Sequence, residues 1–370
     1  MWRTALVYAW PYRCRSLFKA ENYDFENNKN RGEKPMYMFK YVSKRLGLML
    51  FTFFIIFTMC FTLIKLLPIP TNALPGQDPE IVMKTLEGRG WITNIKEGDN
   101  GVWTYDRVPI FIQYGNYIKR IVTQGDFGIA TTYGEYLNMN LWQVFVDHLP
   151  PTILINIYST LIGVPIGLGL GILAALKKNK WQDHTISTLV MVFISVPSFV
   201  YASLILYILC FQLNLFPKTM NPGYAYFTPD MFKSMVPAVL SMSFGSIAGY
   251  ARGTRAELTE VLTSEFMLLA RTKGLTKSQA TTRHALRNAM VPIFPSIIGE
   301  FISVLSGSLV IEKIFSIPGV GGLYLAAINS QDYDFFMMLS AFYLLVGLAA
   351  TLVIDLSYGI IDPRIRMGAK

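Results

Sequence analysis

PPTILINIYSTLIGVPIGLGLGILAALKK, residues 150 to 178, is an almost uninterrupted apolar segment that ends in two lysines. It is longer than the roughly 20 residues that a helix needs to cross a bilayer. Gly163, Gly167, Gly169 and Gly171 remove side-chain bulk, so a second helix could approach closely. The segment therefore predicts a transmembrane helix that packs tightly against a neighbour.

Five further segments are apolar enough to span a membrane, and the composition of the whole chain agrees. Hydrophobic residues make up 52% of the 370 residues and charged residues 15%, with a mean hydropathy of +0.37. These values exclude an ordinary soluble domain. The predicted fold class is an all-α polytopic membrane protein whose six transmembrane helices cover 46–67, 150–176, 185–211, 236–252, 293–311 and 335–361.

The distribution of Lys and Arg predicts the orientation of these helices. Both residue types concentrate in the connections on the side that carries both termini, which is the pattern of cytoplasmic loops. We therefore expect a cytoplasmic N-terminal extension at 1–45, a long extracellular loop at 68–149 and a cytoplasmic loop at 255–291. Before about Met36 two alternatives stay open: a surface-lying amphipathic segment, or extra residues from an upstream start codon.

The long loop 68–149 carries signals for structure of its own. LPGQDP and EGDNG predict turns, and PIFIQYGNYIKRI, residues 109–121, has helical spacing. Lys65, just before this loop, lies near a predicted helix end, where its long side chain could reach the membrane surface.

The stretch EFMLLARTKGLTKSQATTRHALRNAMVP, residues 265–292, predicts two helices joined at Gly274. Apolar spacing from Leu258 to Leu269 predicts a helix that ends before this glycine, which can adopt a left-handed conformation. Thr276 and Gln279 have the spacing of a capping box, so a second helix should run from near Lys277 to about Asn288, with Pro292 at the next boundary. Basic residues cluster along the stretch, as they also do in ordinary cytoplasmic loops.

Several motifs then follow one another in a fixed order. ARTKGL and RHALRNAMVP are followed by IEKIFSIPGVGGL at Ile311 to Leu323, by NSQDYDFF, and by IDLSYGIIDPRIR at Ile354 to Arg366. Together they resemble the permease subunits of bacterial oligopeptide and dipeptide ABC importers, in the binding-protein-dependent transport inner-membrane component family. Leu268 and Leu269 depart from the glutamate and alanine that the wider superfamily prefers at these positions.

This resemblance implies the type I ABC importer permease fold, with a transport core at 150–366. It implies that the chain forms half of a translocation pathway for oligopeptides in a bacterial cell membrane. The implied partners are a second homologous permease subunit, two cytoplasmic ATPase subunits that bind ATP and Mg, and an extracellular peptide-binding lipoprotein. No cofactor is expected in this chain.

The resemblance also implies that the loop 255–291 contains the coupling helix, which transmits movement of the ATPases to the membrane helices. The matched or adjacent residues expected to serve this coupling are Glu265, Ala270, Arg271, Lys273, Gly274, Leu275, Arg283, His284 and Arg287.

Four residues are candidates for lining the pathway: Glu300, Ser303, Pro318 and Gly319. Glu300 lies within the fifth predicted span, where a carboxylate is costly unless it faces a polar cavity or a partner helix. An internal hydrogen bond to another span is its alternative. Pro318 and the glycines after it predict a turn beyond that span. Pro197 predicts a kink in the third span.

Other classes of function find little support in the sequence. It contains no GxxxxGK[ST] phosphate loop, HExxH or GxSxG motif, so we expect no catalytic residue and no metal site. The net charge of +9 follows the predicted membrane sides, which argues against nucleic acid binding. Two alternatives remain open: the same architecture importing nickel, an opine, haem or an oligosaccharide, and an ATP-independent secondary transporter or membrane receptor.

Overall fold

The computed structural model describes residues 34–69, 78–97, 103–130, 136–220 and 227–361. The chain separates into two compact units, Met1–Leu46 and Gly47–Lys370. Because the described residues begin at 34, the predictions for residues 1–33 lie outside them. So do most of the predicted turns LPGQDP and EGDNG and the end of the last motif, up to Arg366.

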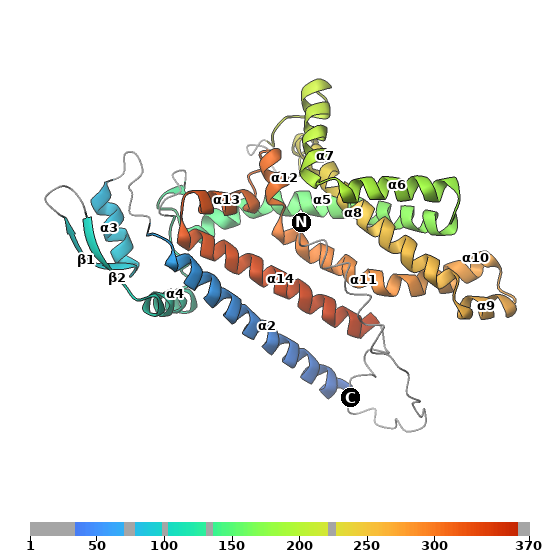
Figure 1. Cartoon of the computed structure of the whole chain (residues 1–370), viewed down its shortest axis with the longest axis horizontal. Coiled ribbons are helices and arrows are strands. Elements are labelled where there is room, and N and C mark those ends of the chain that lie inside the picture. Colours follow the sequence, from blue (N-terminus) through green and yellow to red (C-terminus); the bar gives the residue numbers. More distant parts are fainter. Residues whose placement is uncertain (1–33, 70–77, 98–102, 131–135, 221–226, 362–370) are drawn as a thin grey trace. The chain divides into compact units, whose positions relative to one another are not determined.

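Long apolar helices dominate the structure (Figure 1). Within the described residues, five stretches are long and apolar enough to cross a membrane, and a strongly bent pair could supply a sixth. The five are α2 (Lys34–Leu66), α5 (Leu141–Leu176), α8 (Pro229–Leu262), the run Lys277–Ser306 and α14 (Tyr333–Ile361). The all-α polytopic fold predicted from the sequence is therefore confirmed.

The third predicted span, 185–211, is not one continuous helix. α6 (Trp181–Ser195) and α7 (Ser198–Ile205), which continues into the π-helical η3 (Leu206–Gln212), meet at an angle of 100°. Pro197 stands at the break, because proline lacks an N–H group and its ring clashes with the preceding helical turn. The predicted kink is present, and its size divides the predicted segment into two helices.

The fifth span also differs from its prediction of 293–311. One helical run begins at α10 (Lys277–Ala280), passes through the π-helical η4 (Thr281–Ala285) and α11 (Leu286–Ser303), and ends in the short 3-10 helix η5 (Val304–Ser306). Pro292 lies inside this run, so the predicted boundary there is wrong. Membrane helices tolerate such prolines because neighbouring groups can satisfy the freed carbonyls.

Glycines bring α5 and α8 into close contact, as the sequence predicts. A Cβ added at Gly163, Gly167 or Gly171 would lie 2.6 to 2.8 Å from side chains of α8. These three glycines are four residues apart and therefore share one face of α5. Gly169 has no neighbour within 4 Å, so the prediction of a close approach is wrong there.

A small subdomain is inserted between α2 and α5. It consists of α3 (Pro79–Gly88), the antiparallel strands β1 (Ile92–Glu97) and β2 (Trp103–Arg107), and α4 (Ile110–Gln124). We call it the insert subdomain. The helical spacing at 109–121 correctly predicts α4. Figure 1 shows this subdomain at one end of the helices and α9 (Glu265–Thr272) with α10 at the other.

Candidate functional site

The segment between α8 and α11 forms a compact hinge at one end of the helices. α8 ends at Leu262, and α9 begins at Glu265 after an extended Ser264. The continuous helix predicted from Leu258 to Leu269 is therefore wrong, because the chain breaks in its middle. The hinge therefore contains a helix of its own, α9, separate from α8.

Gly274 ends this helix as the sequence predicts. Its φ of +90° lies in the left-handed region that favours glycine, and an added Cβ would meet no atom within 4 Å. Thr276 and Gln279 then form the predicted capping box: the Gln279 N–H donates to Thr276 Oγ1 at 3.3 Å, and the Thr276 N–H donates to Gln279 Oε1 at 3.1 Å. The turn between the two helices is therefore fixed from both sides.

A cluster of small side chains joins the hinge to three long helices. Met267 and Ala270 of α9 pack with Leu258 of α8 and Ala175 of α5. On the far side they pack with alanines of the helical run that becomes the fifth span, Ala280, Ala285 and Ala289. Because protein interiors are close-packed, displacing α9 must displace these helices as well.

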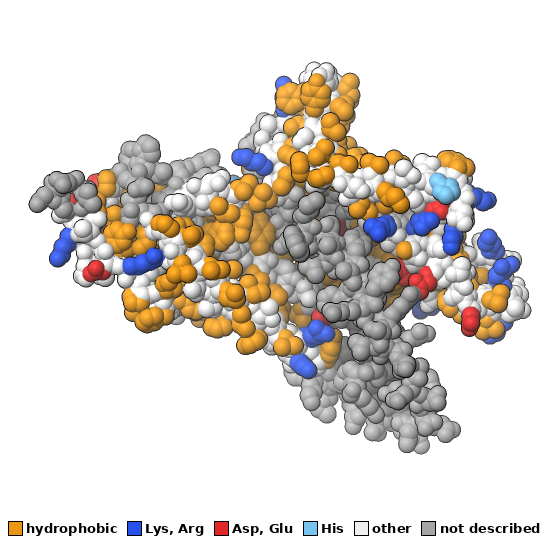
Figure 2. All heavy atoms as spheres, in the orientation of Figure 1, with side chains coloured by type: hydrophobic (Ala, Val, Ile, Leu, Met, Phe, Trp, Pro, Cys, Tyr) orange, Lys and Arg blue, Asp and Glu red, His pale blue; other side chains and the backbone are white. Residues whose placement is uncertain are grey.

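The other face of α9 is exposed and partly apolar. Leu268 and Leu269 are 66% and 56% exposed, and Phe266 is also exposed. Glu265, Arg271 and Lys273 are exposed around them, and Figure 2 shows Lys and Arg gathered at this end of the molecule. The combination of exposed leucines and cations is typical of a protein interface.

The remaining predicted coupling residues divide into two groups. Arg283, His284 and Arg287 are exposed on η4 and α11, where they extend the cationic surface. Ala270 is buried and Leu275 is half-buried, so both belong to the packing that supports the surface. The sequence prediction grouped these residues together and missed this division, and their coupling role stays a prediction.

An ion pair stiffens the helices that lead to the hinge. Asp183 of α6 is buried and accepts two hydrogen bonds from Arg255 of α8, from Nε at 2.5 Å and from Nη2 at 2.8 Å. It also accepts the N–H of Asn179 at 2.9 Å. A bidentate arrangement of this kind fixes the relative rotation of the two helices.

The predicted pathway residues lie in two places. Glu300 accepts a hydrogen bond from Ser246 Oγ of α8 at 2.7 Å, and Ser303 Oγ donates to the Glu300 carbonyl oxygen at 2.7 Å. This contact fits the internal hydrogen bond that was the alternative for Glu300. Pro318 and Gly319 lie instead in the turn before α13 (Val320–Asn329). Gly321 and Gly322 belong to the first turn of α13, so the predicted turn ends earlier than expected.

A buried carboxylate organises that turn, and sequence reasoning did not single it out. Glu312 of α12 (Leu309–Ile314) is 3% exposed. Its Oε1 accepts from Thr152 Oγ1 at 3.0 Å, and its Oε2 accepts from the Gly321 N–H at 2.8 Å. Burial raises the pKa of Glu312 from 4.5 to about 7, against the lowering effect of these hydrogen bonds.

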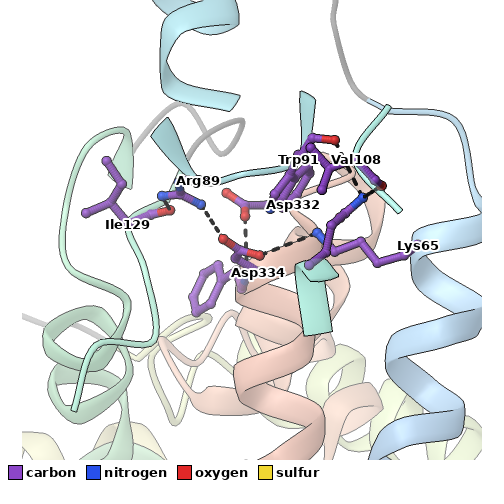
Figure 3. Close-up of polar contacts among 9 residues, drawn as sticks. Lys65, Arg89, Trp91, Val108, Ile129, Asp332 and Asp334 are labelled. Atoms are coloured by element: carbon purple, nitrogen blue, oxygen red, sulfur yellow. Dashed lines mark hydrogen bonds and ion pairs between the residues drawn. The ribbon is translucent and has the colours of Figure 1, made fainter. Parts of the chain in front are cut away.

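A second buried carboxylate ties the insert subdomain to α14 (Figure 3). Asp334 accepts from Arg89 Nη1 at 2.5 Å and lies 3.8 Å from the Lys65 ammonium of α2. Arg89 also donates to the Ile129 carbonyl oxygen at 2.6 Å. The Lys65 ammonium lies over the Trp91 ring, 3.0 Å from its centroid. We call Lys65, Arg89, Trp91 and Asp334 the Asp334 cluster.

The Asp334 cluster corrects one prediction. Lys65 is buried, so it does not reach the membrane surface as expected. Nearby, Trp91 stacks on Tyr333, and the Tyr333 hydroxyl donates to the Pro68 carbonyl oxygen at 2.7 Å. The cluster joins parts of the chain that are about 250 residues apart, so no local pattern in the sequence could indicate it.

These features define the class of protein: a polytopic membrane subunit with an exposed hinge helix between two of its long helices. The chain belongs to the family of binding-protein-dependent transport system inner membrane components, whose model matches residues 167–367. It is therefore a transport subunit and one component of a larger membrane transporter.

Full-length relatives support this assignment. The chain is 33% identical over 330 residues to the dipeptide transport system permease protein DppB of Lactococcus lactis subsp. cremoris, covering 89% of this chain and 100% of that protein. DppB of Bacillus subtilis is also 33% identical, over 336 residues that cover 90% and 100%. Oligopeptide transport system permease protein OppB of Escherichia coli is 29% identical over 329 residues, covering 89% and 100%.

Proposed function

We propose that this chain forms half of the pathway of an ATP-driven peptide importer and couples that pathway to cytoplasmic ATPase subunits. The observation that carries the coupling role is the hinge. The α9 helix is exposed on one face and packed through Met267 and Ala270 against three long helices on the other. The peptide cargo is supported by the relatives, which are named dipeptide and oligopeptide permeases.

The exposed face of α9 suits a groove on an ATPase. Leu268 and Leu269 would fill apolar positions, and Arg271 and Lys273 would meet acidic side chains around them. ATP and Mg would be held by two such ATPases. When ATP draws them together, α9 would move with them and tilt α5, α8 and α11 through the packed cluster.

The proposal extends to the rest of the assembly. Both termini and the hinge would lie in the cytoplasm, with the insert subdomain outside the cell. There it would offer a docking surface to an extracellular peptide-binding lipoprotein. A second, homologous permease subunit would complete the pathway, with Glu300, Ser303, Pro318 and Gly319 as candidates for its lining.

The test of cargo is uptake by cells with and without an intact copy of this gene. Isotope-labelled tri- to hexapeptides are supplied, with labelled nickel and a labelled oligosaccharide in parallel. Loss of peptide uptake alone, restored by the wild-type gene, is the expected result. Loss of a different solute with normal peptide uptake would keep the transporter and overturn the peptide assignment.

The test of coupling is a Gly274→Val copy of the gene. Valine at φ +90° cannot keep the backbone of this turn without strain, so the link from α9 to α10 should distort. We expect normal membrane insertion, retained ATP hydrolysis and little peptide uptake. Gly47→Val, at an exposed glycine of α2 with open space around it, is the matched control. Full uptake by Gly274→Val would contradict the coupling role.

A further inference from the structure

The helix α4 of the insert subdomain contacts the membrane helix α2 below its end. Tyr114 and Tyr117 pack against two phenylalanines of α2: the ring centroids of Phe61 and Tyr114 are 5.1 Å apart, and those of Phe57 and Tyr117 are 6.2 Å apart. Residues 46–64 of α2 carry no charge and span about 28 Å, close to the thickness of the hydrocarbon layer, about 30 Å. Phe61 and Phe57 lie about 6 Å and 12 Å inside the end of this stretch. α4 therefore lies at the depth where headgroups meet acyl chains.

The part of α4 that faces away from α2 has an apolar side and a polar side. Phe111 and Val122 are 76% and 77% exposed, and their spacing of three helical turns places them on one side. Asn116, Lys119 and Thr123 are also exposed, and their spacing of three and four residues places them together on another side. Figure 2 shows hydrophobic side chains gathered over α2 and α4. An apolar side next to a cationic polar side is typical of a helix that lies in the membrane surface.

A pocket of about 310 Å³ lies between the polar side of α4 and the end of α3. The α4 side of the lining includes Asn116, Lys119 and Arg120, and the α3 side includes Glu87 and Arg89. Arg120 Nε is buried, yet it has no hydrogen-bond partner among the described residues. A buried donor of this kind normally has an acceptor, so the pocket lacks a group that would supply one.

The two sides of the pocket differ in charge. Lys119 and Arg120 make the α4 side positive. On the α3 side, Glu87 is negative, and the C-terminal end of the helix adds a partial negative charge. Arg89 does not change this balance, because its charge is met by Asp334. A matching ligand carries an anionic group and a cationic group next to each other.

We propose that this pocket binds the headgroup of one phosphatidylethanolamine molecule from the leaflet on the side of the insert subdomain. The phosphate would accept hydrogen bonds from Lys119 and Arg120, and the ammonium group would donate to Glu87. The acyl chains would run past Phe111 and Val122 into the hydrocarbon layer. The bound lipid would hold the insert subdomain on the membrane surface. This role goes beyond the transport function and does not depend on the cargo or on the ATPases.

A soluble ligand of the same charge fits the position of the pocket less well. The phosphate and ammonium groups of a phospholipid already lie at the depth of α4, so little ordering is needed to bring them into the pocket. The exposed apolar side chains of α4 would also contact acyl chains, which a soluble zwitterion lacks.

The test is lipid binding to the purified full chain, measured by native mass spectrometry after its co-purified lipids are removed. Three ligands are titrated: phosphatidylethanolamine, phosphatidylglycerol and the water-soluble glycerophosphoethanolamine. We expect the first to bind most tightly, because phosphatidylglycerol lacks the ammonium group and glycerophosphoethanolamine lacks the acyl chains. Equal or tighter binding of phosphatidylglycerol would overturn the proposal. Equal binding of glycerophosphoethanolamine would overturn the assignment to a membrane lipid.

Substitutions then locate the site. Replacing both cations, Lys119→Ala with Arg120→Ala, should weaken phosphatidylethanolamine binding by roughly tenfold or more, because two charge-assisted hydrogen bonds are lost. Glu87→Gln should remove the preference over phosphatidylglycerol. Lys96→Ala, at an exposed lysine of β1 outside the pocket lining, is the control for a lost positive charge.

The same loss of affinity in Lys96→Ala and in the double variant would contradict the site. Should the double variant fail to fold, Lys119→Ala alone decides, because this side chain is exposed and its removal leaves the packing of α4 intact. Weaker phosphatidylethanolamine binding by Lys119→Ala than by Lys96→Ala supports the site, and equal binding contradicts it.

Discussion

Gly274 and Gly319 both occupy positions that favour glycine, but for opposite reasons. At Gly274 the backbone has a φ of +90° and the space around it is empty, so glycine is required by conformation alone. At Gly319 the φ of −111° suits any residue, but a Cβ would overlap Glu312 and lie 2.5 Å from Thr152 Oγ1. The exposed hinge therefore depends on chain geometry, whereas the opposite end depends on a filled polar interior.

The two ends of the molecule also differ in the contacts that join them to the long helices. The hinge offers an exposed surface backed by closely packed side chains, and in the proposed function a partner docked there would push on several helices. The other end holds buried charges, Glu312 and the Asp334 cluster, that join the insert subdomain and α13 to the long helices. Substitutions at the two ends should therefore fail in different ways.

The largest effect is expected at Asp334. Asp334→Asn would leave Arg89 and Lys65 buried beside a neutral side chain, and removing one partner of a buried ion pair costs about 3–5 kcal/mol. Thermal unfolding of the purified chain in detergent measures the loss. Asp106→Asn, at an exposed position on β2, is the control. Unfolding temperatures that agree between the two variants would show that the cluster is not a structural joint.

A smaller loss is expected for Gly319→Ala. The added methyl group must displace the Glu312 carboxylate or Thr152, and overpacking of this kind costs about 1–3 kcal/mol. Gly322→Ala, three residues later, adds the same methyl group in open space within a helix and should leave stability unchanged or improve it slightly. If Gly319→Ala and Gly322→Ala shift the unfolding temperature equally, the crowding around Glu312 does not affect the free energy of unfolding.

The smallest effect on stability is expected for Gly274→Ala. No clash arises, so the cost is the strain of an L-residue in a left-handed conformation, about 1 kcal/mol. Peptide uptake should fall more than stability, since the hinge angle changes. Gly274→Asn should retain more uptake than Gly274→Ala, because asparagine tolerates left-handed conformations better. The reverse order would indicate that bulk, rather than backbone conformation, limits this position.

Sequence patterns predicted what is local and repetitive. Long apolar segments gave the membrane helices, glycine spacing gave the contact of α5 with α8, and Thr276 with Gln279 gave the capping box. The break at Thr263 and Ser264 escaped prediction, because the apolar spacing continues across it. The 100° bend at Pro197 exceeded expectation, because a proline indicates where a helix can break and leaves the angle to tertiary packing.

The position of the candidate site along the sequence could be predicted, but several of its contacts could not. The hinge could be located because its turn residues are contiguous in sequence. Glu312 and Asp334 could not be assigned a role, since their partners Thr152 and Arg89 lie far away along the chain. One signal was present at Asp334, which lies between Tyr333 and Phe335, because such an acid must find a partner once it is buried. Glu312 is followed by Lys313 and carried no such signal.

The length of α8 has a mechanical consequence. Its 34 residues make a rod of about 51 Å, while the hydrocarbon layer is about 30 Å thick. The glycines of α5 pack against part of one side of this helix. The helix therefore behaves as a lever whose free end is at α9. A tilt of about 5° around its centre would displace that end by about 2 Å, comparable to the helix shifts that switch other proteins. In the proposed function, a small movement at the end of α8 beside α9 would therefore be transmitted to the opposite end of the helix.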